Sequence, residues 1–147
     1  MPQAEPLQAV VLDASVAVRW VVSEKGSDQA AALLDLPFSW VAPRLLLTEA
    51  ASALRRKAAE GDLDPGLASE ALDALLQAVA DGVVRLTDDE RVVAQALRLA
   101  LTLQHKLPDC VYLAIAERDG AAIATADSKL ARLARSRGIR VFEVVHA

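Results

Sequence analysis

Short apolar runs alternate along this chain with longer amphipathic segments. The apolar runs predict strands at 10–12, 39–42, 83–86, 121–125 and 139–144. The segments between them have the period of helices, and many begin at Ser, Asp or Pro and end near Gly. Their expected ranges are 15–22, 27–36, 43–60, 64–81, 108–118, 127–137 and a helix from Asp88 or Asp89 to Leu103.

Strands that alternate with helices indicate a mainly parallel sheet covered by helices on both faces. The 147 residues suit one domain with one core, without an obvious linker or repeat. We therefore expect an α/β fold over residues 1–147, in which residues 1–8 form a short N-terminal extension.

Composition narrows the class of protein further. Hydrophobic residues make up 54% of the chain, which excludes general disorder, and a net charge of −4 argues against a protein that coats nucleic acid through bulk positive charge. Cys110 is the only cysteine, so neither an internal disulfide nor a cysteine-based zinc site is expected. Because the sequence shows neither a signal peptide nor a membrane-spanning run, the simplest interpretation is a soluble cytoplasmic protein.

Acidic residues follow two of the predicted strands. Asp13 comes directly after the run 10–12, and Asp127 comes two residues after Thr125. In open α/β sheets, ligands collect outside the carboxyl ends of the strands, so both positions are candidates for a site. Each aspartate has an equally good local explanation, since Asp is also a preferred first residue before a helix.

Two further acids lie in strongly apolar helical segments. Asp109 is in the first turn of its predicted helix, where a negative charge favours the helix dipole. Glu49 falls at the edge of the apolar face of its helix, with Arg56 at a similar angle two turns later. If Glu49 is partly buried, its carboxylate needs a partner. The alternative is that Glu49 is an ordinary glutamate at the edge of the protein surface.

Taken together, the four carboxylates indicate a metal site. Carboxylates held close together repel one another and raise each other's pKa values, and a divalent cation removes that conflict. Oxygen ligands without Cys or His suit Mg²⁺ or Mn²⁺ better than zinc. Such a cation can orient a phosphodiester and lower the pKa of an attacking water.

The set of motifs resembles the PIN domain family, and within it the VapC-type toxins of type II toxin–antitoxin modules. The resemblance is carried by VVLDASVAVRWVV, APRLLLTEAASALRR, LPDCVYLAIAERDGAAIATAD and RGIRVF, and it runs from about Val10 to Phe142. It implies a PIN-like α/β/α sandwich with a central sheet of about five strands. It also implies a Mg²⁺- or Mn²⁺-dependent endoribonuclease that forms a homodimer and binds a VapB-like antitoxin.

The resemblance also assigns roles to individual residues. Asp13, Glu49, Asp109 and Asp127 match the family's acidic quartet and would be the metal ligands. Ser15 and Thr125 match two hydroxyl residues that would position a carboxylate or a metal-bound water. Their ordinary alternatives are a hydroxyl at a helix start and a plain strand residue.

RNA phosphates require positive charge near the site. Basic residues cluster in 129–140 and in 55–57, and Arg19 follows Asp13 closely. Most of them are expected to be solvated helix residues, with Lys129 and Arg19 as candidates for lining a groove. Tyr112 is expected to belong to the core.

Other functions fit parts of the pattern. A phosphotransferase of the haloacid dehalogenase type needs a second Asp two residues after the first, and Ser15 stands there. A PIN nuclease that processes RNA outside a toxin–antitoxin module, and a non-catalytic PIN module that binds RNA or protein, remain alternatives. A small antitoxin gene directly upstream would separate the toxin from the first of these.

Overall fold

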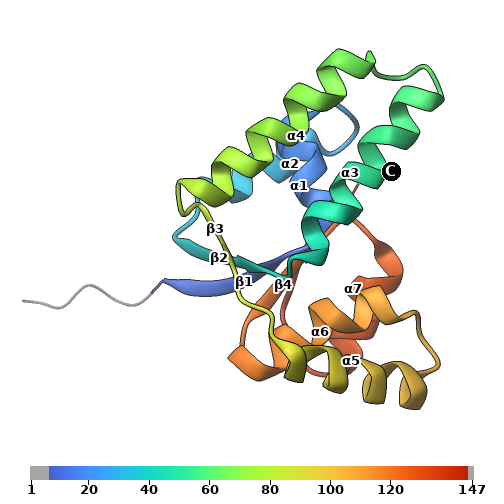
Figure 1. Cartoon of the computed structure of the whole chain (residues 1–147). Coiled ribbons are helices and arrows are strands. Elements are labelled where there is room, and N and C mark those ends of the chain that lie inside the picture. The colour runs from blue at the N-terminus through green and yellow to red at the C-terminus, as the bar shows by residue number, and fades with distance from the viewer. Residues whose placement is uncertain (1–6, 146–147) are drawn as a thin grey trace, which may run out of the picture.

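The computed structural model describes residues 7–145, which contain a five-stranded, entirely parallel sheet (Figure 1). The strand order is β3-β2-β1-β4-β5. The strands are β1 (Gln8–Leu12), β2 (Phe38–Ala42), β3 (Val84–Leu86), β4 (Ala122–Thr125) and β5 (Val141–Glu143). All five predicted strands are present. The expected N-terminal extension lies mostly outside the described residues, and Gln8 already belongs to β1.

Helices cover both faces of the sheet (Figure 1). One layer contains α1 (Ala14–Val21), α2 (Ser27–Leu33), α3 (Leu45–Ala59) and α4 (Pro65–Ala80). The other contains α5 (Glu90–Leu103), α6 (Leu107–Asp119) and α7 (Ser128–Ser136). Val10 and Leu12 of β1 pack in the first core and Val11 in the second, as alternation along a strand requires. The predicted α/β/α sandwich is confirmed.

Local chemistry explains where the helices begin and end. Asp64, Asp89 and Asp127 each accept hydrogen bonds from backbone N–H groups in the first turn of the following helix. The predicted helix 27–36 ends earlier, at Leu33. The next residues form a tighter turn, because Pro37 disfavours a helical conformation at the residue before it.

The sheet topology creates a crevice beside β1. From β1 the chain enters α1 in one helix layer and returns as β2, whereas from β4, the other neighbour of β1, it enters α7 in the opposite layer. Connections that leave two adjacent parallel strands toward opposite faces leave open the space beyond their carboxyl ends. No helix within residues 7–145 is long and apolar enough to cross a membrane.

Candidate functional site

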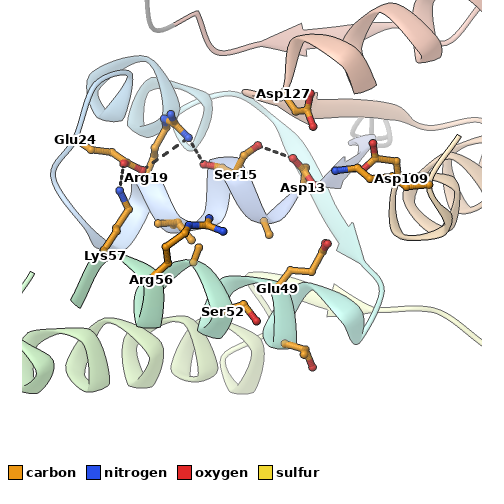
Figure 2. Close-up of a pocket in the computed structure, with 15 residues that line it drawn as sticks. Asp13, Ser15, Arg19, Glu24, Glu49, Ser52, Arg56, Lys57, Asp109 and Asp127 are labelled. Atoms are coloured by element: carbon orange, nitrogen blue, oxygen red, sulfur yellow. Dashed lines mark hydrogen bonds and ion pairs between the residues drawn. The ribbon is translucent and has the colours of Figure 1, made fainter. Parts of the chain in front are cut away.

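A pocket of about 510 Å³ lies in this crevice, and the four predicted acidic residues line it (Figure 2). Asp13 comes from the end of β1 and Glu49 from the first turns of α3. Asp109 comes from the first turn of α6, and Asp127 from the link between β4 and α7. The fold therefore brings together carboxylates that are up to 114 positions apart in the sequence.

Asp13 is buried, with 7% of its surface exposed, and two hydroxyls hold its carboxylate. Ser15 Oγ and Thr125 Oγ1 both donate to Asp13 Oδ2, at 2.5 and 2.9 Å. Ser15 Oγ also accepts from the N–H of Ala126, which links the start of α1 to the residue after β4. Asp13 directly precedes α1, but the Ser15 and Thr125 hydroxyls hold its carboxylate, and within the described chain it lacks the paired capping hydrogen bonds that Asp64, Asp89 and Asp127 accept.

The environment of Asp13 opposes its charge. Burial raises the pKa of Asp13, and the negative charge of Asp109 raises it further, while the Ser15 and Thr125 hydroxyls act in the opposite direction. The net shift of the pKa is upward. The pocket thus holds a carboxylate whose ionised form is destabilised unless positive charge is supplied.

Glu49 is half-buried and is bound by Tyr112. The Tyr112 hydroxyl on α6 donates to Glu49 Oε1 at 2.6 Å. Burial raises the pKa of Glu49, as do the charges of Asp13 and Asp109, whereas the Tyr112 hydrogen bond lowers it. Burial is also the main cause that raises the pKa of Tyr112, so its hydroxyl remains a donor at neutral pH.

Asp109 is buried, with 5% of its surface exposed, and two neighbouring side chains contact it. His105 Nε2 lies 2.7 Å from Asp109 Oδ2, and Lys106 Nζ lies 3.7 Å from Asp109 Oδ1. His105 lies in the short connection between α5 and α6, and Lys106 directly precedes α6. His105 therefore helps to orient the Asp109 carboxylate. The sequence gives no sign of this role, because its two histidines form no metal motif.

Asp127 is both a helix cap and a pocket residue. Its Oδ1 accepts hydrogen bonds from the N–H groups of Lys129 at 2.8 Å and Leu130 at 3.4 Å. The same side chain lines the pocket, where Figure 2 shows it opposite Asp13. For this residue the local explanation and the site explanation hold together.

Of the two basic residues predicted to line a groove, Arg19 does so and Lys129 does not. No other basic residue of the segment 129–140 lines the pocket either. Arg135 and Arg137 of that segment form ion pairs with Glu143 and Glu117 instead. The positive side of the pocket comes mainly from α1 and α3.

Ser15 and Thr125, which the sequence analysis named, contact Asp13, whereas the contacts of Tyr112 with Glu49 and of His105 with Asp109 were missed. Tyr112 was expected to be a core residue, and it is fully buried, but its hydroxyl reaches Glu49. The only available signal was the rule that a buried tyrosine hydroxyl usually finds a polar partner. His105 lies before the start of α6, so no helical spacing in the sequence indicates its contact with Asp109.

The carboxylates share a pocket but do not form a closed ligand cage. No group of three or more His, Cys, Asp or Glu side chains within residues 7–145 is arranged so that it could hold a metal ion by itself. All four acids nevertheless present hard oxygen atoms to the same space, which is the donor chemistry of Mg²⁺ and Mn²⁺ sites.

Fold and site together define a member of a known family. Residues 10–136 match the family model of the PIN domain, so the chain belongs to the PIN domain family. This confirms the family resemblance seen in the sequence. No curated protein sequence matches the chain significantly.

Solved structures share the fold at low sequence identity. PAE2754 from Pyrobaculum aerophilum is 23% identical with a TM-score of 0.67, and the match covers 94% of this chain and 92% of that one. VapBC2 from Rickettsia felis, solved with a DNA fragment from its promoter, is 11% identical with a TM-score of 0.63, covering 92% and 98%. FitAcB from Neisseria gonorrhoeae is 17% identical with a TM-score of 0.57, covering 94% and 99%. At these identities the likeness concerns the fold.

Proposed function

We propose that this PIN domain is a metal-dependent endoribonuclease that acts as the toxin of a type II toxin–antitoxin module. The observation that carries the proposal is the shared pocket of Asp13, Glu49, Asp109 and Asp127 at the carboxyl ends of β1 and β4. PIN domains are generally nucleases. In this chain the four acids line the crevice at the carboxyl ends of the strands, where open α/β sheets bind their ligands.

Mg²⁺ fits the chemistry of the pocket, and Mn²⁺ is a possible substitute. Mg²⁺ usually keeps several of its waters and takes only one or two carboxylates plus substrate phosphate, so a closed protein cage is not required. The raised pKa values of Asp13 and Glu49 support a cation, because burial and repulsion between the acids disfavour their ionised forms. Asp13, Glu49, Asp109 and Asp127 would be the residues that hold it.

When bound, the cation would supply charge neutralisation at the phosphodiester and a more acidic water. The chain's own contribution is to hold each carboxylate in place. Ser15 and Thr125 hold the Asp13 carboxylate, while Tyr112 holds Glu49. These bonds keep the oxygen atoms directed at the pocket before any substrate arrives, and such preorganisation lowers the reorganisation needed during reaction.

The assignment as a toxin rests on the sequence resemblance to VapC-type proteins. The structural neighbour VapBC2 carries the name of the same family, which supports the proposal at the level of the fold. The proposal includes a VapB-like antitoxin and a homodimer as partners. Val93, Leu97 and Leu101, spaced four residues apart on α5, expose apolar surface of the kind that a second copy would cover.

The test is cleavage of single-stranded RNA by antitoxin-free protein with Mg²⁺ or Mn²⁺, and again after addition of EDTA. Asp109→Asn serves as the inactive control after circular dichroism has shown that it folds, and Asp73→Asn on the exposed face of α4 serves as the matched control. We expect cleavage that needs metal, persists in Asp73→Asn and disappears in Asp109→Asn. Cleavage that persists in Asp109→Asn would contradict the proposed site, and RNA binding without cleavage would favour a non-catalytic module.

A further inference from the structure

Charge is unevenly distributed in the pocket: Asp13, Glu49, Asp109 and Asp127 lie near the ends of β1 and β4, and the bases of α1 and α3 lie on the other side. The basic residues that line it are Arg19, Arg56, Lys57 and Lys106. Arg19 is committed to the protein, since its guanidinium donates to the carbonyls of Ser15 and Lys25, both at 2.8 Å. It therefore stabilises the turn after α1 more than it offers a free charge.

Two of the other bases are also paired. Lys57 forms an ion pair with Glu24, and Lys106 lies 3.7 Å from Asp109. Arg56 differs, because within residues 7–145 it forms neither an ion pair nor a side-chain hydrogen bond. Figure 2 shows its guanidinium directed from α3 into the space that Ser15 and Glu49 face. Arg56 is thus the uncommitted cation of the pocket.

The spacing on α3 places Arg56 on the same face as Glu49, two helical turns further along. Glu49, Ser52 and Arg56 are separated by three and then four residues, so they share one face of the helix, and all three line the pocket. With a rise of 1.5 Å per residue, Arg56 lies about 10 Å along the helix axis from Glu49. The two side chains thus start two helical turns apart, which leaves room for a group at Arg56 beside one held by the carboxylates.

We infer that Arg56 forms a subsite for a backbone phosphate of the RNA strand that flanks the bond to be cleaved. The inference rests on the proposed function and extends it by naming the residue that holds the strand. A guanidinium can bind two phosphate oxygens in parallel, which fixes the strand's position as well as attracting it. Ser52 provides a hydroxyl between Arg56 and Glu49, along the path that the strand takes.

The neighbouring residue supplies a matched control. Arg55 has the same charge and lies on the same helix, but it is exposed in a separate hollow between α3 and α4. Arg55→Gln and Arg56→Gln therefore remove equal charge from the protein, and only the second removes it from the pocket. Arg56→Lys retains the charge and removes the paired hydrogen bonds.

The experiment measures binding of fluorescein-labelled single-stranded RNA by anisotropy, with Asp13→Asn present in every protein to prevent cleavage. Arg56→Gln should weaken binding about tenfold at low salt and reduce the slope of log K against log[KCl] by about 0.7, the value for one phosphate contact on a single strand. Arg55→Gln should leave the slope unchanged. Arg56→Lys should restore the slope but not the full affinity.

A second measurement locates the phosphate. Single methylphosphonate substitutions remove one phosphate charge at a time from the RNA. At one position away from the cleaved bond, the substitution should weaken binding to the protein that retains Arg56. It should leave binding to the Arg56→Gln variant unchanged.

Equal effects of Arg55→Gln and Arg56→Gln would overturn the inference, as would the absence of a methylphosphonate position that depends on Arg56. Cleavage of RNA by the wild-type chain, measured separately, distinguishes this failure from that of the proposed function. A chain that neither binds nor cleaves RNA would overturn both.

Discussion

Replacing Asp13 with Asn should stabilise the metal-free protein while abolishing cleavage. Asn has nearly the same shape as Asp, and its carbonyl oxygen can still accept a hydrogen bond from Ser15 or Thr125. The substitution removes the buried charge and its repulsion with Asp109, which together raise the pKa of Asp13. A raised pKa means that folding disfavours the ionised form, so a neutral isostere should gain stability.

The expected gain is about 0.5–2 kcal/mol in the free energy of unfolding, the range that single stabilising substitutions commonly give. For a chain of this length, each kcal/mol raises Tm by about 2–4 °C. The effect should depend on pH in a defined direction. The folded state binds a proton on Asp13 at a higher pH than the unfolded chain does, where the ordinary pKa is 3.8. Ionised Asp13 therefore lowers stability at neutral pH, and this penalty shrinks as the pH falls through the folded pKa.

The assay is thermal and urea unfolding in EDTA at pH 7.5 and again in mild acid. Asp73→Asn on α4 is the control, because removal of an exposed charge there should change stability by less than about 0.5 kcal/mol. The advantage of Asp13→Asn over the wild type should be largest at pH 7.5 and smaller in acid. A variant less stable than the wild type at pH 7.5, or an advantage that grows in acid, would refute the reasoning.

Three further predictions concern the other groups of the pocket. Tyr112→Phe should lower kcat/KM for RNA about 10- to 100-fold, as loss of an orienting partner typically does. The loss should be greater at pH 6 than at pH 8, since Glu49 loses the hydrogen bond that lowers its pKa; equal rates for variant and wild type at both pH values would contradict this. Mg²⁺ at about 100 times its Kd should stabilise the wild type by about 2.7 kcal/mol in a thermal shift titration and leave Asp13→Asn unchanged, and an equal shift in both would place the ion elsewhere. Thr125→Val should raise the pKa of Asp13 further, because one of its two hydroxyl donors is lost. As the pH is lowered, the variant should therefore lose activity at a higher pH than the wild type does.

Most of the fold could be predicted because its signals are local. Each buried strand is a short apolar run, and Asp64 and Asp89 stand where helices need a side-chain acceptor. The boundaries are less certain where the backbone changes its hydrogen-bond pattern gradually. The end of α2 is one such place, since residues 34–36 continue to turn without continuing the α-helix.

The acids of the site and the hydroxyls of Ser15 and Thr125 could be predicted, but the contacts of Tyr112 and His105 with the acids could not. Residues 110–116 of α6 are all buried, so the sequence offers no polar face that would single out Tyr112. Its contact with Glu49, 63 positions away, depends on how the tertiary fold places α3 and α6 beside the carboxyl end of β1. His105 follows Gln104, whose φ of 51° lies in a left-handed conformation that hydrophobic patterns do not reveal.

The distribution of the pocket over four separate elements has a consequence for synthesis of the protein. A chain that has grown only as far as α6 contains Asp13, Glu49 and Asp109, but β4 and Thr125 are not yet present to bind Asp13 from its other side. β1 then has β2 as its sheet neighbour and lacks the second strand of the crevice. The pocket is therefore incomplete until β4 and Asp127 have been synthesised and β4 has joined the sheet. A growing polypeptide on the ribosome, surrounded by RNA, carries no finished site until that strand is in place.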